Sequence, residues 1–347
     1  MAFGRSRQTS EYKKKGCKQQ APGFTVNLTD RQCIKMADEQ LGFIGLGNMG
    51  VEMSKHLQNY LVSKQEPNLI YYNRTISKGD ELKGLGGVPG ESVADVVSKS
   101  SIVFVMMTND EVTKRVFDEA IGSGSLKGKL LINSATISPQ LAEEIGNAVN
   151  AAGGSFLAGP VFGLPVVAAK AQLVFVVSGP KDQLDRVAPY MGSMSKAQKY
   201  MGEDYKRAQV MKLTGNTFII GLMEVVGEAM VLGEANGIKS EDLAEWAEAV
   251  GGPFLGLYFR KNSAGIYNPG ENGSPLISTE NILKDALLAQ ELGKSANAHL
   301  PTVSTAVDHF NQLLQRPEKN LDGSAIYGLL RLQAGLPFEN DAVQNRK

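Results

Sequence analysis

Residues 41–50, which read LGFIGLGNMG, decide the fold of this chain. The first four residues of the stretch are apolar or small and have the composition of a buried strand. Gly45, Gly47 and Gly50 follow with the spacing G-x-G-x-x-G, and residues 51–63 then carry apolar side chains at helical spacing. The order of strand, glycine turn and helix predicts a phosphate-binding turn of the kind that holds dinucleotides.

Each glycine has a steric task in such a turn. Gly45 permits the tight turn, Gly47 lets the backbone approach a pyrophosphate, and Gly50 lets the helix pack closely on the strand. Free N–H groups and the positive end of the helix dipole would then hold the phosphates. The alternative interpretation is an ordinary strand-to-helix turn without a ligand. The cofactor-binding residues predicted here are Gly45, Leu46, Gly47, Asn48, Met49 and Gly50.

A second apolar run, residues 69–72, ends in Asn73, Arg74 and Thr75, where a dinucleotide-binding fold contacts the ribose. An acidic residue at this place would bind the 2′-hydroxyl of NAD. The guanidinium of Arg74 and the hydroxyl of Thr75 suit a 2′-phosphate instead. We therefore expect NADP(H) rather than NAD(H) as the cofactor.

Composition narrows the class of protein. The 347 residues are enough for about two domains, and 42% of them are apolar. The formal net charge is zero, so no overall field favours nucleic acid or a membrane surface. There is no apolar run long enough to span a membrane. The two cysteines and three scattered histidines have no metal-binding spacing, and the absence of a disulfide framework favours the cytoplasm.

Three regions differ in pattern. Residues 1–38 are basic and poor in large apolar side chains, which predicts a disordered tail, with a mitochondrial leader as the alternative. Residues 39–202 alternate strand-like and helical runs, which predicts a Rossmann-type, doubly wound and mostly parallel sheet. Its further strands are expected at 101–107, 129–134, 155–160 and 172–177. Ligands bind beyond the carboxyl ends of such strands, so Met106, Met107, Ser134 and Thr136 should lie at the cofactor cleft.

Residues 203–340 lack strand signals and predict a second, all-helical domain. The run 203–237 is expected to form one long interdomain helix that ends near Asn236 and Gly237. The other helices are expected at 240–250, 279–292 and 297–315, and residues 262–276 read as a connection rich in Gly, Pro and Asn.

Lys212 and Asn216 lie four residues apart on this long helix and therefore share one face. Their neighbours are apolar, so burial would disfavour the charged form of the amine and bring its pKa towards the working range. Lys212 could then exchange a proton with a carbonyl or hydroxyl oxygen, while Asn216 holds that oxygen. The competing interpretation is a lysine whose stem packs on the helix and whose amine reaches water.

Several motifs together resemble the β-hydroxyacid dehydrogenase family, which contains 3-hydroxyisobutyrate dehydrogenases, glyoxylate/succinic semialdehyde reductases and 6-phosphogluconate dehydrogenase. The resemblance covers about residues 40–335. It implies that Lys212 is the catalytic lysine, that Asn216 binds substrate, and that Thr136 lies by the nicotinamide. It also implies homodimers or tetramers. The motifs are GFIGLGNMG, Ser134–Ala135–Thr136 with Pro139, the loop Gly159–Pro160–Val161–Phe162–Gly163, Lys212–Leu213–Thr214–Gly215–Asn216, and the pair Lys284 and Asp285, of which the lysine closes over the cofactor.

Three residues depart from the family pattern. Phe162 and Leu164 stand where a serine and a second glycine are usual in the substrate loop, and Gly215 replaces an asparagine. The expected substrate site, which comprises Ser134, Phe162, Gly163, Leu164 and Asp285, is therefore less polar than in small hydroxy-acid dehydrogenases.

The function expected from these patterns is an NADP(H)-dependent oxidoreductase that acts on a small carbonyl compound or β-hydroxy acid. Two alternatives remain open at this point. One is an imine reductase, which uses the same cofactor on a C=N bond but generally lacks the lysine. The other is a non-catalytic nucleotide-binding interaction module, which the basic tail would permit.

Overall fold

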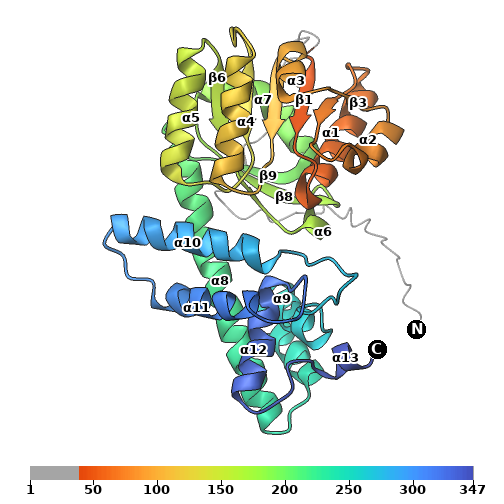
Figure 1. Cartoon of the computed structure of the whole chain (residues 1–347), viewed down its shortest axis with the longest axis vertical. Coiled ribbons are helices and arrows are strands. Elements are labelled where there is room, and N and C mark those ends of the chain that lie inside the picture. The colour runs from red at the N-terminus through yellow and green to blue at the C-terminus, as the bar shows by residue number, and fades with distance from the viewer. Residues whose placement is uncertain (1–38, 347) are drawn as a thin grey trace, which may run out of the picture.

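The computed structural model describes residues 39–346, so the predictions for residues 1–38 lie outside the described part of the chain. Figure 1 shows two parts joined by one long helix, α8. The upper part is a sheet covered by helices on both faces. The lower part is a set of helices gathered around the second half of α8.

The upper part is built on a six-stranded parallel sheet with the order β3-β2-β1-β4-β5-β6. The strand order reverses beside β1, whose neighbours are β2 and β4. This is the topology in which dinucleotides bind at the carboxyl ends of the central strands. The strands are β1 (Leu41–Ile44), β2 (Ile70–Tyr72), β3 (Val88–Pro89), β4 (Ile102–Val105), β5 (Leu130–Asn133) and β6 (Ser155–Ala158).

Alternate residues of these strands enter two separate cores. Phe43, Phe104 and Ile132 pack against α1 (Asn48–Lys64) and α7 (Lys181–Met194). Their strand neighbours pack on the other face, against α3 (Val93–Lys99), α4 (Asp110–Gly122) and α5 (Pro139–Ala151). Burial on both faces explains why the strands read as continuous apolar runs. Two short elements, η1 (Ile76–Gly79) and α2 (Asp80–Gly84), connect β2 to β3.

The expectation that residues 172–177 belong to the same parallel sheet is wrong. They form β8 (Leu173–Val177), the centre of a separate sheet with the order β7-β8-β9. β7 (Val161–Phe162) pairs antiparallel with β8, and β9 (Ser195–Tyr200) pairs parallel with it. The chain reverses between β7 and β8, and the short helix α6 (Pro165–Ala168) lies in this connection. An apolar run is the same in either sheet, so the pattern did not reveal the partner strand.

The long helix α8 (Lys206–Ala235) has 30 residues, which corresponds to about 45 Å. It ends as predicted, with Gly237 in a left-handed conformation at φ 83°. α8 contacts both parts of the molecule, from α5 and β8 to the helices of the lower part. Those helices are α9 (Ser240–Ser263), α10 (Thr279–Ser295), α11 (Pro301–Leu314), η2 (Gly323–Ala325), α12 (Ile326–Gln333) and α13 (Asp341–Gln344).

The predicted helix at 240–250 continues further than expected. α9 bends at Gly252, where φ is 73° and ψ is −176°, and helix resumes at Pro253. The Gly-Gly-Pro sequence reads as an end, but proline is well tolerated in the first turn of the resumed segment. No helix within residues 39–346 combines the length and the apolar character needed to cross a membrane.

Candidate functional site

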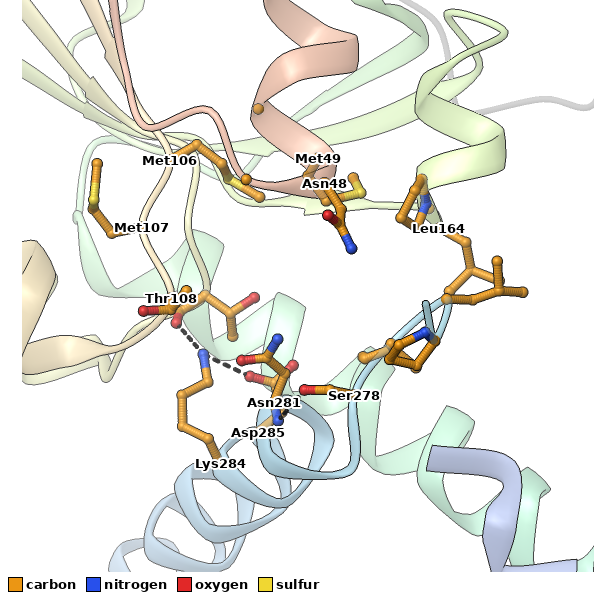
Figure 2. Close-up of a pocket in the computed structure, with 18 residues that line it drawn as sticks. Asn48, Met49, Met106, Met107, Thr108, Leu164, Ser278, Asn281, Lys284 and Asp285 are labelled. Atoms are coloured by element: carbon orange, nitrogen blue, oxygen red, sulfur yellow. Dashed lines mark hydrogen bonds and ion pairs between the residues drawn. The ribbon is translucent and has the colours of Figure 1, made fainter. Parts of the chain in front are cut away.

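A cleft between the two parts brings most of the predicted cofactor and substrate residues together (Figure 2). Asn48 and Met49 from the start of α1, with Met106 and Met107 after β4, face Ser278, Asn281, Lys284 and Asp285 at the start of α10. Leu164 lies at one side. The lining residues are Gly47, Asn48, Met49, Gly50, Met106, Met107, Thr108, Thr136, Gly163, Leu164, Pro165, Pro275, Leu276, Ile277, Ser278, Asn281, Lys284 and Asp285.

A side chain at any of the three glycine positions would either collide with the backbone or extend into the cleft. Gly45 has φ 99°, and a Cβ there would lie 2.2 Å from the Met106 carbonyl oxygen. A Cβ on Gly50 would lie 2.0 Å from the Gly45 carbonyl oxygen. A Cβ on Gly47 would meet no atom of the described chain within 4 Å, because this position opens into the cleft. Gly45 and Gly50 therefore allow the backbone of the turn to pack closely, while Gly47 leaves the backbone open to a ligand in the cleft.

This turn fits the phosphates of a dinucleotide. Among the described residues, no side chain caps the first turn of α1, so its N–H groups stay available at the cleft. The helix dipole also favours an anion at this point. Gly47, Asn48, Met49 and Gly50 all line the cleft and are placed to hold the cofactor. Leu46 differs, since its side chain is buried in the core.

Asn73 supports the glycine turn rather than pointing to a ligand. Its Oδ1 accepts a hydrogen bond of 2.9 Å from the Leu46 N–H, and its Nδ2 donates to the Thr75 carbonyl oxygen at 2.7 Å. Arg74 and Thr75 are exposed at the end of β2. Arg74 has no hydrogen bond or ion pair with residues 39–346, so its guanidinium is available to an anion beside the turn.

The loop after β5 presents Thr136 to the cleft and buries Ser134. Gln209 of α8 holds this loop: its Nε2 donates to the Ala135 carbonyl oxygen at 3.0 Å, and its Oε1 accepts from the Ile137 N–H at 3.2 Å. Ser134 is 1% exposed, and its Oγ has no hydrogen-bond partner within the described chain. Thr136 therefore lies on the lining, whereas Ser134 lies beneath it.

Lys212 and Asn216 lie directly behind the lining, next to Asp285. Lys212 is 8% exposed, and its Nζ lies 4.4 Å from the centre of the Phe162 ring. Within residues 39–346 its amine has no hydrogen bond or ion pair. Burial lowers the pKa of Lys212 to about 8; the charge of Asp285 opposes this shift and that of Lys284 adds to it. Asn216 donates from Nδ2 to Asp285 Oδ2 at 2.6 Å.

Lys284 connects the two parts across the cleft. Its Nζ donates to the Thr136 carbonyl oxygen at 2.7 Å and lies 2.9 Å from Asp285 Oδ1 (Figure 2). Asp285 is itself 6% exposed and receives Asn216 on its other oxygen. The predicted residues of α8 and α10 therefore form one polar cluster beside the cleft.

Phe162, Gly163 and Leu164 form the side of the site nearest to α6. Gly163 has φ 139°, and a Cβ there would lie 2.6 Å from Leu173 Cδ2. Gly163 and Leu164 line the cleft, while the half-buried Phe162 ring lies between the loop and α8. As expected from the sequence, the loop offers apolar side chains where the family pattern has a serine hydroxyl.

The sequence did not identify the segment before α10 or the supporting role of Gln209. Pro275, Leu276, Ile277, Ser278 and Asn281 line the cleft, although residues 262–276 read as a connection. The start of the helix was predicted, since α10 begins at Thr279, and the Ser278 side chain caps it by accepting from the Asn281 N–H at 3.3 Å. Among residues 39–346, no group of three or more His, Cys, Asp or Glu side chains is placed to hold a metal ion.

Comparison with known proteins agrees with this architecture. A family model described as the NAD binding domain of 6-phosphogluconate dehydrogenase matches residues 40–202. The NADH-dependent oxidoreductase ucdB of Aspergillus ustus is 29% identical, over 84% of this chain and 98% of that protein. The mitochondrial 3-hydroxyisobutyrate dehydrogenase of Drosophila melanogaster is 27% identical, over 84% of this chain and 90% of that protein.

A solved structure shows the same fold. The 3-hydroxyisobutyrate dehydrogenase of Mycobacterium tuberculosis superposes with a TM-score of 0.71, covers 85% of this chain and all of its own, and is 24% identical. The sheet order, the glycine turn, the long helix and these relatives agree on one assignment. Residues 40–202 therefore carry an NAD(P)-binding domain of the 6-phosphogluconate dehydrogenase type, and the chain as a whole is an oxidoreductase similar to the β-hydroxyacid dehydrogenases.

Proposed function

We propose that this protein is an NADP(H)-dependent oxidoreductase that interconverts a small carbonyl compound and the corresponding alcohol, with Lys212 as the group that moves the proton. The observation that carries the proposal is the buried amine of Lys212 beside the polar cluster of Asn216, Lys284 and Asp285, directly behind the cleft. A bound nicotinamide would supply or accept the hydride at the carbonyl carbon.

The residues of the chain account for the rest of the reaction. In the reductive direction, protonated Lys212 gives a proton from Nζ to the carbonyl oxygen while that oxygen gains negative charge. In the oxidative direction, the neutral amine takes the hydroxyl proton. A pKa of about 8 leaves both forms of the amine populated near neutral pH, which serves both directions. Asn216, fixed by Asp285, is placed to orient the same oxygen.

The choice of NADP(H) rests on Arg74. Arg74 is exposed beside the glycine turn and has no hydrogen bond or ion pair in the described chain. Residues 73–75 at the end of β2 include no Asp or Glu that would favour the 2′-hydroxyl of NAD(H). A guanidinium binds a 2′-phosphate by charge and paired hydrogen bonds. One relative is named as NADH-dependent, so both cofactors belong in every assay.

A substrate panel tests the proposal. Oxidation of NADPH and NADH would be followed with aldehydes, keto acids, semialdehydes and cyclic imines for the wild type, Lys212→Met and Lys196→Met. Lys196 is an exposed residue of β9 and serves as the control. We expect turnover of a carbonyl compound and a loss of about a hundredfold or more in Lys212→Met only. Turnover of imines alone, or an undiminished Lys212→Met, would contradict the proposal.

We also propose that the protein self-associates through α8. Four apolar residues on this helix recur every seven positions and are exposed: Met211 at 37%, Phe218 at 63%, Val225 at 57% and Leu232 at 69%. Sedimentation should show a dimer or tetramer that Phe218→Glu with Val225→Glu dissociates, while the exposed control Glu228→Gln leaves it intact. A monomeric wild type would exclude this part of the proposal.

A further inference from the structure

Two residues that depart from the family pattern touch each other in the structure. Gly215 lies inside α8, and its backbone is helical, so its own conformation does not require a glycine. A Cβ at this position would lie 2.4 Å from Phe162 Cε1 and 2.5 Å from Phe162 Cζ. The ring of Phe162 therefore occupies the space that any side chain at position 215 would need. The two departures form one structural change rather than two.

The same ring covers the amine of Lys212. Nζ lies 4.4 Å from the ring centre, which is within the range of a cation–π interaction. Since the amine has no hydrogen bond or ion pair in residues 39–346, the ring face and the nearby charge of Asp285 are what favour its charged form. On this side of the amine, an anionic group of a ligand would have to displace Phe162 before it could pair with Nζ.

The lining of the cleft offers no other cation for a carboxylate. Among residues 39–346, Lys284 and Asp285 are the only ionisable residues that line it. They are already paired at 2.9 Å, and Lys284 also donates to the Thr136 carbonyl oxygen. On the side of Phe162, the lining consists of Gly163, Leu164 and Pro165. Burial of an unpaired carboxylate against such groups is unfavourable.

We propose that the contact of Phe162 with Gly215 restricts the site to neutral substrates, in which an apolar substituent, rather than a carboxylate, lies against Phe162 and Leu164. The inference rests on the proposed function and specifies its substrate class. An apolar substituent gains contact with the ring and with Leu164, whereas a carboxylate loses water without gaining a partner.

The physical coupling of the pair can be tested without any ligand. Replacing a glycine by alanine in a helix normally raises stability. We expect Gly215→Ala to lower the Tm of the wild type, because the new methyl group meets the ring, and to raise the Tm in a Phe162→Ser background. Gly221 is the matched control, since a Cβ there would have its nearest contact at 3.6 Å, an ordinary distance. Gly221→Ala should not change sign between the two backgrounds.

Substrate choice is tested with succinic semialdehyde and its methyl ester, which differ in charge at one end. We expect the wild type to favour the ester in kcat/KM by about tenfold or more. The double variant Phe162→Ser with Gly215→Asn, which carries the residues usual in the family, should reduce this ratio by about tenfold. A wild type that favours the free acid, or a ratio unchanged in the double variant, would overturn the inference.

Measurements of ligand binding distinguish this inference from the proposed function. Butanoate and butanamide have nearly the same shape and cannot react, so their affinities for the cofactor-loaded protein can be measured by calorimetry. Tighter binding of the amide, reversed in the double variant, supports the inference even if every carbonyl compound fails to turn over. Tighter binding of butanoate to the wild type overturns it even if carbonyl turnover that depends on Lys212 is found.

Discussion

The burial of the Lys212 amine predicts how the rate of the reaction depends on pH. Burial lowers the pKa of Lys212 to about 8 from the ordinary value of 10.5. Reduction needs the protonated amine, so its kcat/KM should fall as pH rises through about 8. Oxidation needs the neutral amine and should rise over the same interval. Initial rates in both directions at saturating cofactor would check this, and two parallel profiles would contradict it.

Arg74 is expected to give the protein its preference for NADPH over NADH. The wild type should bind NADPH more tightly than NADH, and Arg74→Ala should weaken NADPH binding by about tenfold while leaving NADH unchanged, because only NADPH carries the 2′-phosphate. Lys83→Ala is the control, since Lys83 is an exposed cation of the neighbouring α2. Fluorescence titration of each variant with both cofactors gives the affinities. Equal affinities of the wild type for the two cofactors would refute the role of Arg74.

The residues of the site differ in how far their sequence context predicted them. Gly45, Gly47 and Gly50 could be placed because each has a steric reason that depends on its near neighbours. Helical spacing placed Lys212 and Asn216 on one face, but their assignment to the site depended on the resemblance to the family motif. The contact of Phe162 with Gly215 could not be predicted, because it joins a loop of the upper part to the long helix.

At the scale of elements, a buried pair joins α8 to α11. Glu224 is 2% exposed, and its two carboxylate oxygens lie 3.0 and 3.1 Å from Nδ1 of His309. The hydrogen bond to Glu224 raises the pKa of His309 above its ordinary value of 6.5. The pair therefore stabilises the fold fully below about pH 6.5, and this contribution is lost as pH rises through the raised pKa.

The variant Glu224→Gln should remove this stabilisation with little change in shape. At pH 6 we expect its free energy of unfolding to fall by about 1.5–3 kcal/mol relative to the wild type, the usual contribution of a hydrogen bond to a charged group. The difference should shrink towards pH 9, because His309 loses its charge as pH rises through its raised pKa. Urea unfolding at the two pH values measures it. A deficit of equal size at both would show that the charge of His309 does not contribute.

Helices and strands were predicted well where a local sequence pattern determines them. They were predicted less well where the neighbouring strand in the sheet or the surrounding fold determines them. Five of the six parallel strands and α8 follow from apolar runs, helical spacing and a glycine at the helix end, whereas the short exposed strand β3 has no such run and was not predicted. β8 was placed in the wrong sheet because its apolar run does not identify its neighbours. The second half of α9 was missed because the bend at Gly252 has the sequence of a helix end.

At the scale of the whole molecule, Lys284 is the group that ties the two parts together over the cofactor cleft. Its hydrogen bond of 2.7 Å runs from α10 of the lower part to the Thr136 carbonyl oxygen of the upper part. Within residues 39–346, the chain passes from one part to the other only through α8. The loop that carries Thr136 is also held by Gln209 of this helix. Removal of the Lys284 bond should therefore let the cleft open without unfolding either part.

The variant Lys284→Met keeps the length of the side chain and removes the charge. We expect the Kd of the cofactor to rise about tenfold, since one charged hydrogen bond no longer favours the closed cleft. The exposed Lys294 in the last turn of the same helix supplies the control Lys294→Met. Calorimetry with NADPH gives the Kd, and hydrogen exchange should rise in residues 134–137. An unchanged Kd, with unchanged exchange in that loop, would mean that Lys284 does not hold the two parts together over the cofactor.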